Sequence, residues 1–206
     1  IIGASALLHR YGEVHKVIKE DGFQPNASVY SIVEGETPAT MAKSTGMAIM
    51  ELSSLFEHLK PDIVITVADR FETMATAVAA SYMNICLGHT QGGEVTGSID
   101  ESVRHAVTKL SHLHFAATER SMEYIIRMGE DPDTVFCTGC PAIDLVANID
   151  LSLPEGLFKR YKGTGPDLDQ TRPYLVVLQH PVTTEYGKGF SQINDCLLYT
   201  SDAADE

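Results

Sequence analysis

The chain has 206 residues, 44% hydrophobic and 21% charged, so it can bury a sizeable core in one or two globular domains. Its formal net charge of −13 argues against nucleic-acid binding, because nucleic-acid-binding proteins present a basic face to phosphate. No apolar run reaches the roughly 18 residues of a membrane helix and four cysteines form no dense disulfide framework, so we expect a cytoplasmic protein without nucleic-acid or membrane partners.

Strand-like and helix-like segments alternate along most of the chain. SVYSIV (28–33) predicts a strand, and an amphipathic helix follows over about 38–59, with proline in its first turn, where helices tolerate it. DIVITVA (62–68) is an apolar, β-branched run typical of strands that are buried on both faces of a parallel sheet. A helix over about 71–82 then leads to the short strand NICLGH (84–89).

The alternation continues after a polar turn, in five further segments: a helix over about 99–111, HFAAT (114–118), the helix ERSMEYIIRMG (119–129), the strand TVFCTG (134–139) and the short helix PAIDLVAN (141–148). Repeated β–α units of this length predict an α/β fold with a Rossmann-like, doubly wound parallel sheet. We assign residues 1–150 to this N-terminal domain.

The remainder of the chain reads differently. Residues 151–173 are rich in proline, glycine and charge and are typical of an interdomain connection. YLVVLQ (174–179) predicts the first strand of a second α/β domain, which we place over 174–194. The chain begins at Ile1 without a methionine, and DCLLYTSDAADE (195–206) breaks the preceding pattern. We therefore expect a fragment with a non-native tail.

Three polar clusters follow strands of the expected sheets. They are ADR (68–70), HTQGGE (89–94) and HPVTT (180–184). In open α/β sheets, ligands bind outside the carboxyl ends of the strands, so this placement favours a ligand site.

The helix that follows the second cluster admits two interpretations of its acids. Ser98 and Glu101 match a capping box, in which Glu101 reaches back to the N-cap and is structural. Asp100 lies in the first turn, where the helix dipole favours a carboxylate, and it can pair with Arg104 four residues later. Alternatively, Asp100 belongs to a ligand site beside the glycine-rich strand end.

The neighbouring residues carry the same ambiguity. Asp69 is either the N-cap of the helix that begins near Phe71 or a member of the site. Gly92, Gly93 and Gly97 are either turn residues or positions at which the backbone approaches a phosphate or sugar.

Other reactive residues do not form recognisable sites. His105, His112 and His114 lack the spacing and the additional ligands of a zinc site, so we expect no metal. The Cys137-Thr-Gly-Cys140 turn superficially resembles a redox motif, but its proline follows the second cysteine and does not separate the two.

Taken together, ADR, HTQGGEVTGSIDESVRHAVTKLSHLHFAATERS, CTGCPAID and QHPVTT resemble the hydrolysing UDP-N-acetylglucosamine 2-epimerases, which make N-acetylmannosamine or related sugars for sialic-acid-like nonulosonates. The likeness runs from about Ile2 to Asn194. It implies a GT-B fold, with a nucleotide sugar between two Rossmann-like halves. By that likeness the chain lacks the opening strand, with its Gly-Thr-Arg loop, and nearly all of the uridine-binding domain. We therefore expect the 206-residue chain to be inactive although the complete protein is an enzyme.

The resemblance also implies a mechanism. Loss of the C2 proton and expulsion of the nucleoside diphosphate leave a glycal, and water then adds at C1 while C2 is reprotonated on the other face. This chemistry needs carboxylates near C1 and C2, positive charge at the diphosphate and no cofactor. The family's acids map onto Asp69 and Asp100 and its cleft histidine onto His180, which are the expected catalytic residues. Arg70 and Arg104 are expected to bind substrate.

The glycine-rich loop supplies further expected site residues: Gln91 and Glu94 for catalysis, and His89, Gly92 and Gly93 for substrate binding. Many family members carry glutamate at the position of Gln91, and a neutral amide cannot act as a general base. Either the two aspartates carry the chemistry, or Glu94 has replaced the missing acid, or the substrate is different. A diacetylated 2,4-diamino sugar, as in legionaminic acid synthesis, is such a substrate.

Two other functions share this architecture. A GT-B glycosyltransferase would pass the sugar to an acceptor, and a non-catalytic nucleotide-sugar sensor is permitted by Gln91. The expected partners are a nucleotide sugar and, for the complete protein, further copies of itself in a homodimer or homotetramer.

Overall fold

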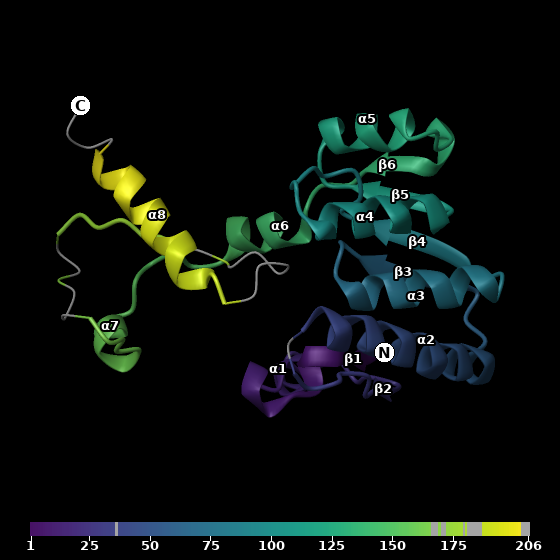
Figure 1. The fold of residues 1–206 in the computed structure, drawn as a ribbon, viewed down its shortest axis with the longest axis horizontal. Coiled ribbons are helices and arrows are strands. Elements are labelled where there is room, and N and C mark those ends of the chain that lie inside the picture. The colour runs from purple at the N-terminus through teal and green to yellow at the C-terminus, as the bar shows by residue number, and fades with distance from the viewer. Residues whose placement is uncertain (36, 166–168, 170–171, 179, 181–186, 203–206) are drawn as a thin grey trace. The chain divides into compact units, whose positions relative to one another are not determined.

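The computed structural model describes the chain except residues 36, 166–168, 170–171, 179, 181–186 and 203–206 (Figure 1). It divides into two compact units, Ile1–Cys140 and Pro141–Glu206. No described helix is both long enough and apolar enough to cross a membrane. The two units divide after residue 140, whereas the sequence predicted a domain boundary near residue 150. The predicted boundary stays a prediction.

The first unit holds the sheets. Its strands are β1 (Ile2–Gly3), β2 (Ser28–Val29), β3 (Ile63–Val67), β4 (Cys86–Thr90), β5 (Leu113–Ala116) and β6 (Val135–Cys137). Its helices are α1 (Val14–Glu20), α2 (Pro38–Leu59), α3 (Phe71–Tyr82), α4 (Ile99–Leu110) and α5 (Glu119–Arg127), with 3₁₀ turns at Ala4–Leu7, His9–Tyr11 and Pro132–Thr134. The second unit contains α6 (Pro141–Asn148), α7 (Leu157–Arg160) and α8 (Gly189–Asp202).

The strands form two parallel sheets. Strands β1 and β2 pair with each other, and a four-stranded sheet has the order β3-β4-β5-β6. Each strand of the larger sheet is joined to the next through one of the helices α3, α4 and α5, which confirms the predicted α/β fold. Val67 pairs with Thr90 at the ends of β3 and β4, so the segments that follow these strands emerge at the same edge of the sheet.

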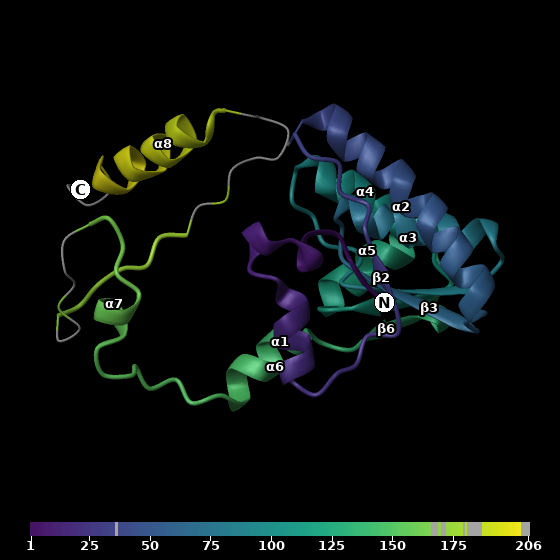
Figure 2. The same cartoon turned by 90° about the horizontal axis from the view of Figure 1, so that it is seen from below.

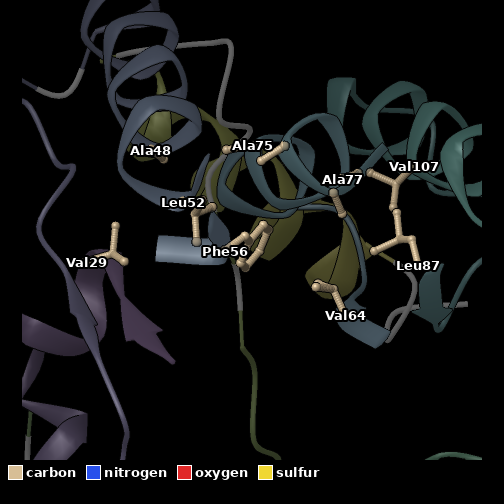
Figure 3. Close-up of a cluster of buried hydrophobic side chains, with 11 residues drawn as sticks. Val29, Ala48, Leu52, Phe56, Val64, Ala75, Ala77, Leu87 and Val107 are labelled. Atoms are coloured by element: carbon tan, nitrogen blue, oxygen red, sulfur yellow. The ribbon is translucent and has the colours of Figure 1, made fainter. Parts of the chain in front are cut away.

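The main hydrophobic core lies between one face of the sheet and the helices α2, α3 and α4 (Figures 2 and 3). Phe56 of α2, Leu87 of β4 and Val107 of α4 are almost completely buried there. Helix α3 contributes mainly alanines, whose small side chains allow it to pack closely between its neighbours. The buried cluster comprises Val29, Ala48, Leu52, Phe56, Val64, Ala75, Ala77, Ala79, Ala80, Leu87 and Val107.

Strand β3 departs from the sequence prediction. Its residues were expected to be buried on both faces, but only Val64 and Thr66 are buried, beneath the helices. Ile63, Ile65 and Val67 point to the opposite face and are between 53% and 62% exposed. The apolar run therefore has one covered face in the described structure, and the prediction of burial on both faces is wrong here.

Helix bounds were predicted more accurately than strand bounds. Helices α2 and α3 begin and end at the predicted residues. The strand predicted over 28–33 stops after Val29, because its partner β1 ends at Gly3, opposite Val29, and turns into a 3₁₀ helix at Ala4. Further on, the Val33 amide donates to Ser44 Oγ of α2 at 2.8 Å. The strand predicted over 84–89 begins only at Cys86, because Asn84 adopts a left-handed conformation with φ 55° at the end of α3.

The strand predicted over 174–179 is not formed. Residues 174–178 have no regular secondary structure, residue 179 lies outside the described residues, and Leu175 and Val176 are highly exposed. A strand needs a hydrogen-bonding neighbour, and the described part of the second unit contains helices only. Helix α8 runs through Asp195, where the non-native tail was expected to begin, and that expectation stays a prediction.

The packing of Phe56 yields a stability prediction. Phe56→Ala should lower the free energy of unfolding by about 3–5 kcal/mol, because it removes a ring that is 2% exposed and leaves a cavity. Met50→Ala, on the same helix but 66% exposed, is the matched control and should change it by about 0.5 kcal/mol or less. Urea unfolding followed by circular dichroism measures both. Equal effects of the two substitutions would contradict the assigned core.

Candidate functional site

Strands β3 and β4 are each followed directly by a left-handed residue. Ala68 has φ 59° and Gln91 has φ 60°, although neither is a glycine. The Ala68 amide donates to Thr90 O at 3.0 Å, and the Gln91 amide donates to Phe115 O at 2.9 Å. A left-handed conformation costs such residues about 1–2 kcal/mol, and this strain tends to gather at functional sites. The strained turns direct the segments that begin at Asp69 and Gln91 away from the sheet.

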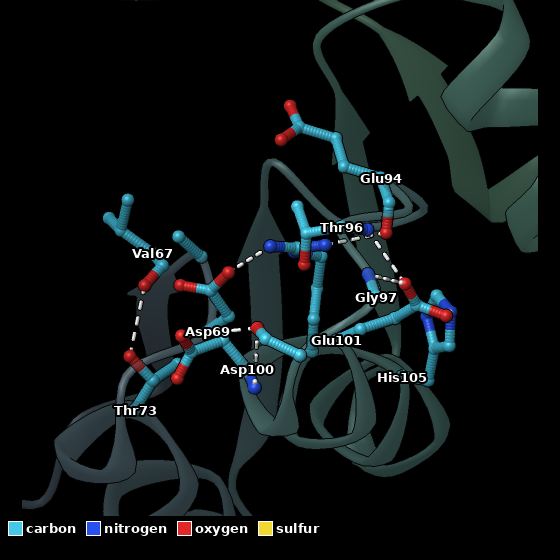
Figure 4. Close-up of polar contacts among 12 residues, drawn as sticks. Val67, Asp69, Thr73, Glu94, Thr96, Gly97, Asp100, Glu101 and His105 are labelled. Carbon is cyan, nitrogen blue, oxygen red and sulfur yellow. Dashed lines mark hydrogen bonds and ion pairs between the residues drawn. The ribbon is translucent and has the colours of Figure 1, made fainter. Parts of the chain in front are cut away.

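Arg104 of α4 connects these segments through its contacts with Asp69 and Glu94, both of which are labelled in Figure 4. Its guanidinium forms an ion pair with the Asp69 carboxylate through Nη2, and its Nη1 donates to the Glu94 carbonyl oxygen at 2.6 Å. Arg104 is only 3% exposed, and its buried Nε has no hydrogen-bond partner among the described residues. Because Asp69 pairs with Arg104 and Arg70 is the N-cap residue of α3, the alternative that Asp69 caps this helix is wrong.

Asp100 lies in the first turn of α4 and is partly buried. Its amide donates to Ser98 Oγ at 3.3 Å, and the same hydroxyl lies 3.4 Å from its Oδ2. Figure 4 shows Asp69 and Asp100 pointing into the same space, beyond the end of β3. Arg104 pairs with Asp69 and not with Asp100, so the alternative of an Asp100–Arg104 pair within the helix is wrong.

Glu101 holds the loop that precedes α4. Its Oε2 accepts hydrogen bonds from the amides of Thr96 and Gly97, each at 2.6 Å, and these bonds lower the pKa of Glu101. The predicted capping box is wrong in its bonds, because Ser98 accepts from the Asp100 amide and Glu101 reaches further back than the N-cap. The structural role predicted for Glu101 is nevertheless confirmed.

His89 of β4 is completely buried. Its Nε2 lies 2.8 Å from Ala68 O, and its Nδ1 lies 3.2 Å from Thr108 Oγ1 of α4. Burial lowers the pKa of His89 from 6.5 to about 4, so the ring is neutral near pH 7. The expected direct contact of His89 with substrate is not supported, because the side chain has no accessible surface and both ring nitrogens face protein atoms.

The two glycines of the loop pack closely against other parts of the protein, and at Gly93 the packing excludes a side chain. A Cβ atom at Gly93, which has φ 79°, would lie 2.2 Å from the Ser121 carbonyl oxygen of α5. A Cβ atom at Gly92 would lie 3.0 Å from His89 Nδ1 and from Thr108 Oγ1. Both glycines are buried, so their first role is to let the loop pack closely, and binding of substrate by their backbone stays a prediction.

Gln91 and Glu94 occupy different surroundings. The Gln91 side-chain amide donates to Cys140 Sγ at 3.4 Å. Glu94 contributes its carbonyl oxygen to Arg104, while its carboxylate extends away from Asp69 and Asp100 in Figure 4. The geometry therefore gives no sign that the Glu94 carboxylate has replaced the acid that is absent at Gln91.

Arg70 lies at the start of α3 and is largely exposed. Its Nε and Nη2 bind the Glu72 carboxylate at 3.2 and 3.3 Å. Arg70 and Glu72 line one end of an open cavity of about 570 Å³ that continues between β1, β3 and α2. The lining does not include Asp69, Asp100 or Arg104, so the acidic centre lies outside this cavity.

His180 is described apart from the residues above, and the cysteines and histidines form no metal site or disulfide among the described residues. His180 belongs to the second unit, where it is exposed, and its expected catalytic role stays a prediction; residues 181–184 of its cluster lie outside the described residues. None of the four cysteines, all of which lie within the described residues, forms a disulfide. Within the described residues, no group of three or more histidine, cysteine or acidic side chains is placed to hold a metal ion.

Thr108 and Ala68 were missed as site residues. Thr108 lies one helical turn after Arg104, and its Oγ1 donates to Arg104 O at 3.0 Å. That i+4 spacing was a usable signal, because it places both side chains on one face of the helix. Ala68 gave no signal, because alanine has no preference for a left-handed turn.

Parallel β–α units joined in this order define a class of protein, a Rossmann-like α/β protein of the GT-B type. The particular family follows from comparison with known proteins. A family model described as UDP-N-acetylglucosamine 2-epimerase matches residues 8–205, and the chain belongs to this family.

Individual relatives agree with this assignment. The chain is 37% identical over 175 residues to the UDP-N,N'-diacetylbacillosamine 2-epimerase (hydrolyzing) of Legionella pneumophila, covering 85% of this chain and 45% of that protein. It is 30% identical over 185 residues to the UDP-N-acetylglucosamine 2-epimerase of Neisseria meningitidis, covering 90% and 47%. The chain thus spans about half the length of the curated relatives it matches.

Solved structures give the same result for the fold. The structure of UDP-GlcNAc 2-epimerase from Neisseria meningitidis, bound to UDP-GlcNAc, superimposes with a TM-score of 0.59 at 27% identity, over 65% of this chain and 37% of that one. A crystal structure of a UDP-N-acetylglucosamine 2-epimerase superimposes with a TM-score of 0.61 at 29% identity, over 69% and 41%.

The packing of the loop predicts unequal effects of alanine at two glycines. Gly97 also has a left-handed conformation, with φ 72°, but a Cβ atom there meets open space. Gly97→Ala should destabilise the protein by about 1–2 kcal/mol, the backbone strain alone. Gly93→Ala adds a clash with Ser121 and should cost about 3 kcal/mol or more. Urea unfolding of both variants tests this, and equal losses would contradict the close packing.

The buried His89 predicts a loss of stability in acid. Because its pKa is lowered to about 4 in the folded protein, the unfolded chain protonates first as the pH falls. Its contribution is fully present above about pH 6.5 and is lost toward pH 4, by on the order of 3 kcal/mol. Urea unfolding between about pH 7.5 and 5 should show a steeper loss for the unsubstituted protein than for His89→Gln, which cannot titrate. Parallel profiles would sink the prediction.

Proposed function

We propose that the complete protein is a hydrolysing epimerase of the cytoplasm that converts UDP-N-acetylglucosamine, or its 4-acetamido analogue, to a free N-acetylmannosamine-type sugar and UDP. Its product would enter synthesis of sialic- or legionaminic-acid-type sugars. The observation that carries the proposal is the convergence of the Asp69 and Asp100 side chains beside the buried Arg104, at the carboxyl ends of parallel strands.

Two carboxylates in one space suit the proposed chemistry. One takes the proton from C2 as the bond from C1 to the UDP oxygen breaks, which leaves a C1–C2 double bond. Water then adds its oxygen at C1 while a proton returns to C2 on the other face, and the free 2-epimer is released. Each carboxylate can act as base in one step and as acid in the next, and no electron is gained or lost overall.

Arg70 is placed to bind the diphosphate of the leaving UDP. Its guanidinium lies at the N-terminus of α3, where backbone amides and the helix dipole favour anions. Its contacts with Glu72 are exposed, and exposed ion pairs contribute little, so a diphosphate can replace Glu72 as the partner. Positive charge at the diphosphate stabilises the charge that develops on the departing UDP.

The relatives support two candidate substrates. The Legionella protein, at 37% identity, acts by its name on UDP-N,N'-diacetylbacillosamine, and the Neisseria protein, at 30%, on UDP-N-acetylglucosamine. We therefore propose the 4-acetamido sugar as the first substrate to test, with UDP-N-acetylglucosamine beside it. Gln91, which cannot act as a base, is consistent with a family branch that relies on the two aspartates.

The deciding assay uses the complete protein with each nucleotide sugar in deuterium oxide. Hydrolysing epimerisation releases UDP together with a free 2-epimer that carries deuterium at C2. Product that forms only when an acceptor is added would identify a glycosyltransferase. Binding without turnover of either sugar would identify a sensor, and both of these outcomes would reject the proposal.

Asp100 and Glu94 provide a matched pair of acid substitutions. Asp100→Asn in the complete protein should lower kcat by at least about 100-fold, because it removes a positioned acid or base. Glu94→Gln should lower it by about 10-fold or less, because only its carbonyl oxygen contacts the site. Both variants should retain their circular dichroism spectra. A complete loss of turnover in Glu94→Gln alone would show that Glu94 supplies the acid.

A further inference from the structure

In addition to the carboxylates, the site contains the buried imidazole of His89. This ring contacts the segment that carries Asp69 and the helix that carries Arg104, the two partners of the buried ion pair. We infer that His89 is a positioning residue that fixes Asp69 and Arg104 relative to each other. The consequence of this role for turnover rests on the proposed function, whereas the positioning itself can be tested without it.

The first contact fixes the segment that carries Asp69. Ala68, which immediately precedes it, has its amide bound to Thr90 O at 3.0 Å and its carbonyl oxygen 2.8 Å from His89 Nε2. The two bonds hold both sides of a residue in an unfavourable left-handed conformation. Without the imidazole, the carbonyl side of this turn loses its buried donor and the direction of Asp69 is no longer fixed.

The second contact fixes the helix that carries Arg104. His89 Nδ1 lies 3.2 Å from Thr108 Oγ1, and this hydroxyl lies 3.0 Å from the carbonyl oxygen of Arg104. The ring therefore spans the distance between the end of β3 and the last turn of α4. Gly92 packs directly against this contact, because a Cβ atom there would lie 3.0 Å from both His89 Nδ1 and Thr108 Oγ1.

The neutral ring suits this bridging position. The Ala68 carbonyl oxygen can only accept, so Nε2 carries the proton. Nδ1 is left as an acceptor that faces the Thr108 hydroxyl, whose single proton is shared between Nδ1 and the Arg104 carbonyl oxygen. Burial is the main cause of the lowered pKa of His89, and the neighbouring charges of His114 and Arg104 act in the same direction. Asp69 opposes them, as does the bond to Ala68. One tautomer therefore persists across physiological pH.

His114 offers a matched control. It is the residue paired with His89 across β4 and β5, it is 1% exposed, and burial lowers its pKa as well. Its Nε2 lies 3.4 Å from Glu130 Oε2, away from the Ala68 turn. Loss of His114 removes a buried imidazole of the same kind without removing a contact to Ala68 or Thr108.

Hydrogen exchange of the Ala68 amide in the 206-residue chain measures the positioning directly. In His89→Leu, its protection should fall by at least about 10-fold relative to amides in the middle of β4, because the turn loses a hydrogen bond. His114→Leu should leave that ratio unchanged, and His89→Gln, which can donate to Ala68 O, should restore most of it. An unchanged ratio in His89→Leu, or an equal fall in His114→Leu, would overturn the inference.

A second comparison applies if His89→Leu does not fold. Thr108→Val removes the hydroxyl partner of Nδ1, whereas Thr108→Ser retains it. Lower Ala68 protection in the valine variant alone supports the bridge through His89. Equal protection in the two variants rejects it.

Kinetics of the complete protein separate this inference from the proposed function. His89→Leu should lower kcat by at least about 10-fold while KM changes by less than about 3-fold, because catalytic geometry depends on placement more than binding does. His89→Gln should recover most of kcat. If Ala68 protection falls as expected but kcat does not, His89 is a positioning residue and the catalytic role proposed for Asp69 is wrong.

Discussion

The ion pair between Asp69 and Arg104 is the interaction on which the rest of the site depends. Arg104 is almost fully buried, and an unpaired charge there would be strongly unfavourable, so the helix and the end of β3 must stay in register. The same guanidinium binds the Glu94 carbonyl oxygen, which ties the glycine-rich loop to the pair. One side chain thus joins three segments that are separated along the chain.

The backbone around this pair is arranged at some cost in stability. Ala68 and Gln91 adopt left-handed conformations, and Gly93 packs so closely on α5 that no side chain fits. Each feature is unfavourable or restrictive by itself, and the two left-handed residues are held by backbone hydrogen bonds, from the Ala68 amide to Thr90 O and from the Gln91 amide to Phe115 O. This combination is typical of a rigid site, in which geometry is set before a ligand arrives.

The sequence predicted those parts of this arrangement that depend on local patterns. Periodicity located α2 and α3 to the residue, and the polar clusters expected after two strands follow β3 and β4, whose ends pair through Val67 and Thr90. It did not predict that His89 faces inward, because a histidine at a strand end has the same local pattern whether it is buried or exposed. Strand pairing explains the outcome for the strand expected over 174–179. The segment has strand propensity, but it has no neighbouring strand among the described residues with which to form hydrogen bonds.

The left-handed backbone at position 91 also limits how this loop can evolve. Residues branched at Cβ, such as valine, isoleucine and threonine, are strongly disfavoured there by the backbone alone, whatever their chemistry. Glutamine and glutamate are both unbranched at Cβ and nearly equal in shape, so the backbone does not discriminate between them. What separates them here is the hydrogen bond that the Gln91 side-chain amide donates to Cys140 Sγ, because an ionised glutamate carboxylate has no proton to donate.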